Sequence, residues 1–354
     1  MKNVILIDPI EDKRWDRFVE DHPFGWICHL SGWKQAIEKS FRHMKGYYFA
    51  LVGGDNRIKA GLPVYEVKSR LTGNRLVSIP FATLCDPLIS TSEDMSILFQ
   101  RVLELSKKLE SKHIQIGTIL SHPLIQNKTF GVVGFYKHHY LPLNSNLEQL
   151  KKKFHRTCVR QRITRAVKSN LKTKLGKDES DLNSFYQIYL QTRKRVGRPL
   201  QPYRFFKNIW ETYYPSNQIV LFLAEKDSRF IAALLLFKFK ERVSAEFAAS
   251  DQAYKNMSPN HYLFWEAIQL AHEGGYKIFD FGRTSPKNKG LMDFKRRWGT
   301  KVIDLPMFYY PKQEAEHTAQ NEESRKFKLV SKICRDAPNF AQGIIGNFCY
   351  RHLG

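Results

Sequence analysis

The chain has 354 residues, of which 57 are Lys or Arg and 34 are Asp or Glu, giving a formal net charge of +23. A hydrophobic fraction of 42% and an aromatic fraction of 13% exclude a wholly disordered chain and leave room for two packed domains. So large a positive charge favours an anionic partner, such as nucleic acid, acidic lipid headgroups or a phosphorylated glycan. No stretch is long and apolar enough to predict a transmembrane segment, and the first residues lack a signal-peptide pattern.

Cysteine and histidine spacing predicts neither a disulfide framework nor a metal site. The five cysteines lie far apart, are odd in number and form no CxxC pair. The twelve histidines show no HxxxH or HExxH spacing. We therefore predict a cytoplasmic protein with no metal ion and no tightly bound cofactor.

The two halves of the sequence resemble each other in the same order, at an offset of roughly 164–176 positions. Each half contains a helix pair, a β-hairpin, further strands, and a helix that leads into a strand. The hairpin covers Tyr48 to Tyr65 in the first half and Val220 to Phe237 in the second. The closing strands are Ile114–Thr118 and Ile278–Gly282. This order predicts an α/β fold of the α+β type with a mixed sheet, built as two related domains.

We place the boundary between the two domains near Pro142–Ser145, where a short linker leads into a basic helix. Residues 1–145 would then form the N-terminal domain, and residues 146–322 the C-terminal domain. Residues 323–354 are predicted to form a basic amphipathic tail.

Within this tail, Phe340, Ile344 and Phe348 recur at helical spacing. A helix of this kind either lies on the inner membrane surface or packs back on the first domain. Both interpretations remain open from the sequence. The first would make the protein peripheral at the inner face of the membrane.

A strongly basic segment opens the second half. Between Lys151 and Lys177 there are eleven Lys or Arg residues and no acid. Phe154, Val159, Ile163, Ala166 and Val167 recur among them at about helical spacing, which predicts an amphipathic helix. Such a helix is either a solvated face or a site for a polyanion. Arg160 and Arg165 are our candidate contacts for a phosphate-bearing glycan, a lipid-linked precursor or tRNA.

The segment from Phe279 to Gly299 contains the strongest candidate site. A strand ends at Gly282, a cation follows at once, and Phe294-Lys295 comes about a dozen residues later, after a predicted flexible loop. Ligands of open α/β sheets bind beyond strand ends, although a structural strand with surface cations would give the same spacing. We predict substrate contacts from the polar and aromatic residues of this segment: Asp280, Arg283, Lys289, Phe294 and Trp298.

The pattern Asp280-Phe281-Gly282-Arg283, followed by Phe294-Lys295-x-x-Trp298-Gly299, resembles the C-terminal signature of the Fem-like (FemABX-like) branch of the GNAT acyltransferase superfamily. Its form is similar to that of FemAB-like proteins associated with exopolysaccharide and exosortase systems. The resemblance extends to His29-x-x-Gly32-Trp33, Gly61-Leu62-Pro63, Arg160-x-Arg162-x-x-Arg165-Ala166 and Pro259-Asn260. It implies two tandem GNAT-like domains.

The resemblance also implies an activity, the transfer of an acyl or aminoacyl group to an amine of a cell-envelope or exopolysaccharide precursor. In Fem ligases the Phe-Lys pair lies at the reaction centre, which implies a catalytic role for Lys295. Glu246, on the preceding predicted strand, is our candidate general base, unless it merely faces solvent. Arg193 and Arg198 lie in a stretch similar to an Arg-x-Gly-x-Pro turn of the family and are candidate anion contacts.

The donor stays open between acyl-CoA and aminoacyl-tRNA as co-substrate. The chain lacks the long helical hairpin with which some Fem ligases contact tRNA. The loop Tyr254–Asn260 lacks the glycines that hold the pyrophosphate of CoA in other GNAT proteins. The alternative to an enzyme is a non-catalytic tandem GNAT-like module that binds an anionic glycolipid or nucleic acid.

Overall fold

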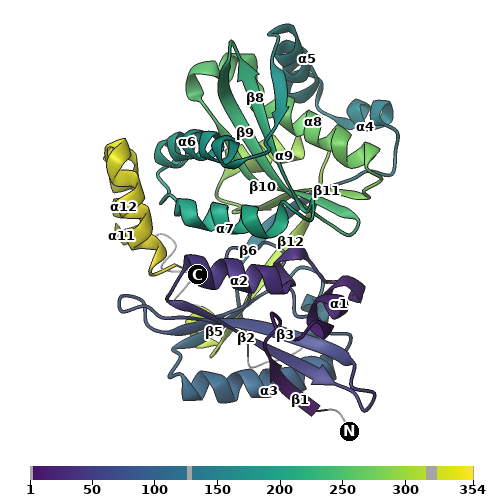
Figure 1. The fold of residues 1–354 in the computed structure, drawn as a ribbon, viewed down its shortest axis with the longest axis vertical. Coiled ribbons are helices and arrows are strands. Elements are labelled where there is room, and N and C mark those ends of the chain that lie inside the picture. The colour runs from purple at the N-terminus through teal and green to yellow at the C-terminus, as the bar shows by residue number, and fades with distance from the viewer. Residues whose placement is uncertain (1–2, 126–129, 316–324, 354) are drawn as a thin grey trace. The chain divides into compact units, whose positions relative to one another are not determined.

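The computed structural model describes residues 3–125, 130–315 and 325–353 (Figure 1). Residues 323, 324 and 354 of the predicted tail lie outside this description. The chain divides into two compact units, each assembled from separate stretches of sequence. Unit 1 consists of Met1–Phe135, Asp304–Lys328 and Gly346–Gly354, and unit 2 consists of Tyr136–Ile303 and Leu329–Ile345.

Unit 1 contains a six-stranded mixed sheet. Its elements are β1 (Asn3–Ile7), α1 (Arg14–Asp21), η1 (Ile27–His29), α2 (Ser31–Ser40), β2 (Met44–Val52), β3 (Ile58–Val67), β4 (Arg75–Val77), α3 (Ser92–Lys108), β5 (His113–Gly117), η2 (His122–Leu124) and most of β12 (Lys301–Tyr310). The strand order is β1-β2-β3-β4-β5-β12. The β4–β5 pair is parallel, and the other neighbouring pairs are antiparallel. In Figure 1, α3 lies on one side of this sheet, and α1 and α2 lie on the other.

Unit 2 repeats this plan. Its elements are most of β6 (Gly131–Pro142), α4 (Leu147–Lys153), the π-helical turn η3 (Arg156–Arg160), α5 (Gln161–Lys168), β7 (Lys172–Leu175), α6 (Glu179–Val196), α7 (Tyr203–Tyr213), β8 (Ile219–Lys226), β9 (Arg229–Phe239), β10 (Arg242–Ser250), η4 (Gln252–Met257), α8 (Pro259–Glu273), β11 (Ile278–Thr284) and α9 (Lys289–Arg296). The strand order is β7-β8-β9-β10-β11-β6, in which β10 and β11 are parallel and the other pairs are antiparallel.

The two units therefore confirm the predicted α/β class with mixed sheets and the predicted repeat. Each unit, however, receives its sixth strand from the other half of the sequence. Strand β6 follows β5 in the chain but pairs with β11, whereas β12 follows β11 but pairs with β5. The structure thus divides the chain differently from the expected boundaries at 145 and 322, because strands at the end of each half exchange partners.

The predicted basic helix is interrupted. The chain leaves α4 through Phe154, whose backbone is extended, and restarts at η3, where His155 Nδ1 accepts a hydrogen bond from the Cys158 amide at 3.2 Å. The apolar residues predicted to face inward are buried: Phe154, Val159, Ile163 and Ala166. They pack in the core of unit 2 with α8 and the hairpin β8–β9. Val167, assigned to the same face, is instead 57% exposed, because it falls on the outer side of α5.

The predicted tail forms two helices, α11 (Arg325–Asp336) and α12 (Asn339–Tyr350). The segment Leu329–Ile345 belongs to unit 2, whereas the described residues before and after it belong to unit 1. In unit 1, Tyr350 packs against the rings of Phe41 and Phe81. Among all described helices, none is both long enough and apolar enough to cross a bilayer.

Candidate active site

Strands β10 and β11 of unit 2 separate at one level. Their parallel pairing ends at Ser244 and Asp280, although β10 continues to Ser250 and β11 to Thr284. Each strand has a bulge directly after this point, at Glu246 in β10 and at Phe281 in β11. Bulges bend a strand and redirect its side chains, and they are frequent beside active sites. The divergence leaves two strand edges available to a ligand.

Asp280 anchors the β11 side of this opening. Its carboxylate is fully buried and accepts hydrogen bonds from His138 Nε2 at 2.8 Å, Arg242 Nη1 at 2.7 Å and the Gly282 amide at 2.6 Å. Burial by itself would raise the pKa of Asp280, but His138, Arg242 and the Gly282 amide outweigh it and hold the pKa below its ordinary value. Asp280 is therefore an ionised structural centre that joins β6, β10 and β11.

The hydrogen bond from the Gly282 amide to the Asp280 carboxylate fixes a turn that only glycine adopts readily. Gly282 has a φ of 70°, in the left-handed region. The carbonyl oxygens of Gly282 and Arg283 both accept hydrogen bonds from Lys295 Nζ, each at 3.0 Å. Asp280 thus sets the backbone conformation that positions the amine of Lys295.

Lys295 lies on α9 and is 6% exposed. An ammonium group has three N–H donors, and two of them are taken by the carbonyl groups of Gly282 and Arg283. Burial lowers the pKa of Lys295 to about 8, against the opposing effect of the Asp280 and Glu246 charges. Within the described residues the third donor has no assigned partner, so it is available to a substrate oxygen.

Glu246, at the bulge of β10, faces the same group of charges. Its carboxylate accepts a hydrogen bond from Ser244 Oγ at 2.6 Å. Burial raises the pKa of Glu246 to about 7, since the lowering effects of Ser244, Arg283 and Lys295 only partly offset it. Glu246 and Lys295, the two residues predicted to be catalytic, therefore influence each other electrostatically, and their pKa values approach each other near neutrality. Such perturbed pairs are typical of functional sites.

The expected loop before Phe294 is largely helical, which corrects the sequence interpretation. Helix α9 begins at Lys289, because the Asn288 side chain caps it by accepting a hydrogen bond from the Leu291 amide at 3.2 Å. Lys289 is exposed at the first helical position. A helix holds Lys295 in place more firmly than the flexible loop predicted there would.

The two aromatic residues predicted to contact substrate differ in burial. Trp298 is fully buried, so it supports the neighbouring rings and does not contact solvent. Phe294 is partly buried against the same core. His261, from the first turn of α8, packs against both rings, at 5.3 Å from Phe294 and 6.0 Å from Trp298. Burial, and then the charge of Arg162, lower the pKa of His261 to about 4, so this imidazole is neutral at physiological pH.

The remaining predicted cations lie on other elements. Arg193 donates two hydrogen bonds to the Pro199 carbonyl, at 3.0 and 2.8 Å, and so holds the turn that follows α6. Arg198 is exposed beyond that turn, and Arg283 is exposed at the end of β11, 5.2 Å from the Tyr136 ring. Nothing in the described contacts joins Arg193 or Arg198 to Lys295.

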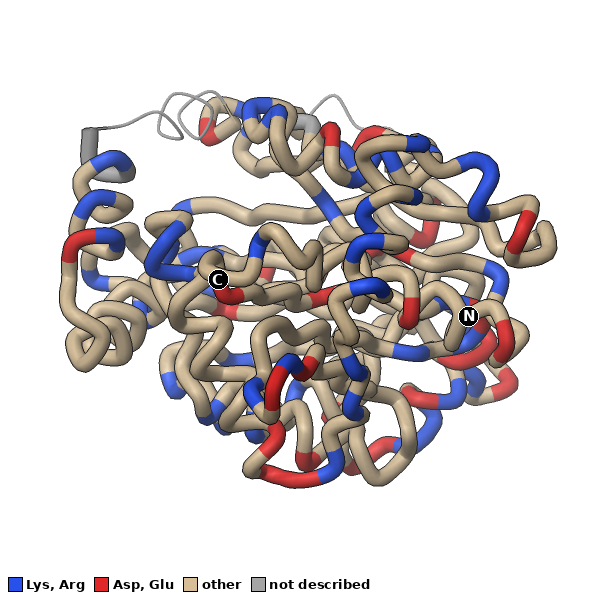
Figure 2. Tube along the Cα trace, turned by 90° about the horizontal axis from the view of Figure 1, so that it is seen from above, with Lys and Arg blue, Asp and Glu red and all other residues tan. Residues whose placement is uncertain are grey.

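Arg160 and Arg165 belong to the basic face of η3 and α5. Arg165 is exposed, whereas Arg160 Nε is buried without a hydrogen-bond partner among the described residues. Lys and Arg, blue in Figure 2, outnumber Asp and Glu, red, across the chain. In the described structure, no cation between positions 151 and 168 pairs with a carboxylate. This face is therefore left with uncompensated positive charge.

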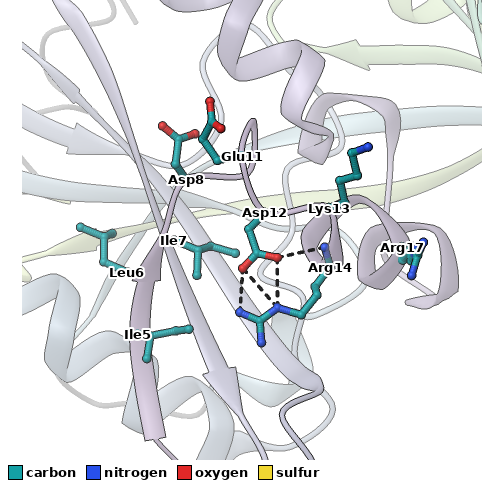
Figure 3. Close-up of a pocket in the computed structure, with 9 residues that line it drawn as sticks. All are labelled: Ile5, Leu6, Ile7, Asp8, Glu11, Asp12, Lys13, Arg14 and Arg17. Carbon is teal, nitrogen blue, oxygen red and sulfur yellow. Dashed lines mark hydrogen bonds and ion pairs between the residues drawn. The ribbon is translucent and has the colours of Figure 1, made fainter.

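Two further features do not contribute to this site. A hollow of about 680 Å³ lies in unit 1 beside β1 and α1 (Figure 3). Its carboxylate Asp12 already accepts a hydrogen bond from Arg14 Nη2 at 2.7 Å. None of the predicted site residues lines it. Across the described residues, no group of three His, Cys, Asp or Glu side chains could hold a metal ion.

Sequence reasoning missed His138, the partner of Asp280. The two residues are 142 positions apart, and their contact depends on the antiparallel pairing of β6 with β11. The available signal was the His138-His139 pair within a β-rich stretch. His139 is also buried, and burial lowers its pKa to about 4.

Comparisons with known proteins show which families this chain resembles. Residues 153–296 match the acetyltransferase (GNAT) domain family. The chain is 21% identical to a lipid II:glycine glycyltransferase of Staphylococcus haemolyticus, over 83% of this chain and 90% of the relative. It is 19% identical to a UDP-N-acetylmuramoylpentapeptide-lysine N(6)-alanyltransferase of Weissella viridescens, over 86% and 93% of the two chains.

The fold agrees as well. The crystal structure of FemX matches 89% of this chain and 99% of its own, with a TM-score of 0.71 and 18% identity. The chain is therefore similar to FemABX-like proteins of the GNAT superfamily. The GNAT match falls inside unit 2 and contains Glu246, Asp280 and Lys295, so the diverging strands lie within the matched domain.

Proposed function

We propose that this protein is an N-acyltransferase that transfers an aminoacyl group to an amine of a cell-envelope or exopolysaccharide precursor. The observation that carries the proposal is the pair Glu246 and Lys295 beside the diverging ends of β10 and β11. One member is a carboxyl group whose pKa is raised to about 7, and the other is an amine whose pKa is lowered to about 8. A base and a cation that both work near neutral pH suit attack by an amine on a carbonyl group.

In the proposed reaction, Glu246 accepts a proton from the ammonium group of the acceptor. The free amine attacks the ester carbonyl carbon of the donor, so that a C–N bond forms and the carbonyl oxygen becomes negative. The third N–H of Lys295 stabilises this oxygen. The C–O bond to the donor then breaks, the surplus proton on nitrogen passes to the leaving oxygen, and Glu246 returns its proton to water.

For the donor we favour aminoacyl-tRNA over acyl-CoA. In the GNAT proteins that use CoA, glycine amides before a helix hold the pyrophosphate. Here the helix α8 is preceded by Ser258, with a φ of 58°, and begins with Pro259, which has no N–H to offer. The basic face of η3 and α5 supports a polyanionic donor. The relatives named above are a glycyltransferase and an alanyltransferase.

The proposed acceptor is an anionic precursor, a phosphate-bearing glycan or a lipid-linked intermediate. One relative is named for lipid II and the other for a UDP-linked muramoylpentapeptide, which supports an acceptor of one of these two kinds. The signature similar to FemAB-like proteins of exopolysaccharide and exosortase systems makes an amino sugar a second acceptor class. Contact with the inner membrane face concerns the C-terminal helices and is a separate proposal.

A direct test offers the purified protein two labelled donors in parallel, glycyl- or alanyl-tRNA and acetyl-CoA, each with lipid II and with its soluble UDP-linked analogue. We expect label from the tRNA ester to appear in an amide of one acceptor. We also expect tRNA binding to weaken steeply with salt. Transfer from acetyl-CoA alone would overturn the choice of donor. Tight binding of an acceptor without consumption of either donor would favour the non-catalytic binding module.

A further inference from the structure

Helices α11 and α12 are yellow in Figure 1. Each helix exposes a stripe of apolar side chains to solvent. On α11, Leu329 is 59% exposed and Ile333 is 45% exposed. On α12, Phe340 is 83% exposed and Ile344 is 70% exposed, and Phe348 continues the row at 57%. The spacing of four residues places each set on one side of its helix. Isolated exposed apolar residues are common, but exposed apolar residues that share one side of a helix indicate an interaction site.

The orientation of the two helices is fixed by their opposite sides. Cys334 and Gln342 are buried, and the Gln342 side-chain amide donates hydrogen bonds to the carbonyl groups of Cys334 at 2.8 Å and Ala337 at 3.1 Å. Lys194 Nζ donates to Asn339 Oδ1 at 3.2 Å, which ties the start of α12 to α6. The apolar stripe therefore points outward because the polar links face inward, the reverse of an ordinary surface helix.

Positive charge borders this stripe. From Lys328 to Leu353 the chain has four cations against the single acid Asp336. On α11 the cations Lys328, Lys332 and Arg335 are exposed. At 100° per residue, Lys328 and Lys332 lie about 60–100° from Leu329 around the helix, whereas Arg335 lies nearly opposite Ile333. Apolar side chains flanked by Lys and Arg are the pattern of helices that lie in the interface of an anionic membrane.

We propose that the outward face of α11 and α12 binds the surface of an anionic lipid bilayer. The apolar row would enter the boundary between headgroups and acyl chains, and the cations would contact lipid phosphates. A second copy of the chain fits less well, since a two-fold contact would bring each basic patch against its own copy. This inference does not depend on the proposed acyl transfer, because lipid binding needs neither donor nor acceptor.

The test is sedimentation of the full chain with vesicles of phosphatidylglycerol and phosphatidylcholine, and with vesicles of phosphatidylcholine alone. We expect binding that rises with the anionic lipid and falls with salt. Phe340→Ser combined with Ile344→Ser should lower the constant for partition onto anionic vesicles about tenfold or more, because two apolar side chains no longer enter the membrane. Leu6→Ser combined with Leu71→Ser is the matched control, since both leucines are exposed, at 56% and 67%, outside the tail. This control should bind as the wild type does.

Circular dichroism and thermal melting show whether each variant is folded. The substituted apolar residues are all exposed, so folding should be retained. Equal binding by the tail variant and the wild type would overturn the proposal, as would no binding to anionic vesicles at low salt. A dimer in sedimentation equilibrium that disappears in the tail variant, together with no vesicle binding, would assign the stripe to a second copy instead. Charge reversal through Lys328→Glu and Lys332→Glu should abolish the preference for anionic lipid while the apolar row remains.

Discussion

In both units a parallel strand pair ends at a corresponding position. Beyond it the two strands stay hydrogen-bonded in unit 1 and diverge in unit 2. In unit 1 the parallel pair β4–β5 ends at Val77 and Gln115, the counterparts of Ser244 and Asp280. Beyond it the strands stay joined, because the Ser78 amide donates to the Gln115 carbonyl at 2.8 Å, and the Gly117 amide donates to Ser78 Oγ at 3.0 Å. In unit 2, Ser244 Oγ donates to Glu246 on its own strand. Asp280 accepts from the Gly282 amide of its own strand and from Arg242 of β10.

The loops that follow differ in the same way. After β5, one oxygen of the buried Asp86 accepts hydrogen bonds from the amides of Ile119, Leu120 and Ser121, at 2.7–2.8 Å. Thr118, at the position matching Arg283, is buried. The backbone beyond the strand end of unit 1 is therefore hydrogen-bonded internally, whereas unit 2 presents an exposed Arg283 and a lysine with one unassigned donor. Two copies of one fold thus differ at the same strand end in their bulges and in their hydrogen bonds.

The largest predicted effect tests whether chemistry resides at the open strand end. Lys295→Met should reduce kcat about 1000-fold, because the donor that stabilises the oxyanion is lost. Lys238→Met is a matched control, since Lys238 is also a buried lysine of unit 2, bonded to Asn217 at 2.8 Å. It should leave kcat within about twofold. Single-turnover kinetics with each variant measures the difference, and equal losses would deny Lys295 a special role.

The second prediction concerns the pH dependence of transfer. Activity requires ionised Glu246, so it should rise as pH passes about 7, and it requires protonated Lys295, so it should fall above about 8. The profile of kcat/KM should therefore be a narrow bell between these values. Glu246→Gln should lower kcat about 100-fold and flatten the acidic limb.

Glu266→Gln provides the control for that variant. Glu266 lies on α8 of the same unit, and burial raises its pKa as well. It should leave both limbs of the profile unchanged. If the acidic limb persists in Glu246→Gln, another group acts as the base.

The smallest effect compares the two buried aspartates. Asp280→Asn and Asp86→Asn each remove a charge that accepts several buried hydrogen bonds, so each should destabilise the protein by about 2–4 kcal/mol in denaturant unfolding. Asp280→Asn should also lower kcat about tenfold, since the Gly282 turn that positions Lys295 relaxes. Asp86→Asn should leave kcat of the folded fraction unchanged. Loss of kcat in both would mean that the closed strand end also serves the reaction.

Local patterns in the sequence were sufficient for the order of elements and for the main segment of the site. The hairpin at Val220–Phe237 alternates between apolar runs and a polar turn, and Phe279–Gly299 has a strand, a glycine and a cation in succession. The pKa shifts of Glu246 and Lys295 depend on burial, which no local pattern reveals. The contact of His138 with Asp280 depends on pairing across 142 positions. The helix cap at Asn288 is a local signal. Gly290, two residues later, favours a flexible loop, so the sequence did not decide between a helix and a loop there.

The exchange of β6 and β12 has a consequence for the order of folding during synthesis. Until the ribosome has made residues 307–310, β5 has no partner on its outer side. Nascent unit 1 therefore carries an open strand edge, which can pair with other chains, throughout the synthesis of residues 136–303. The half made first is completed last. A fragment cut at the end of β6 would keep that edge permanently and should aggregate, so an independent unit 1 requires β12 to be joined to residues 1–135.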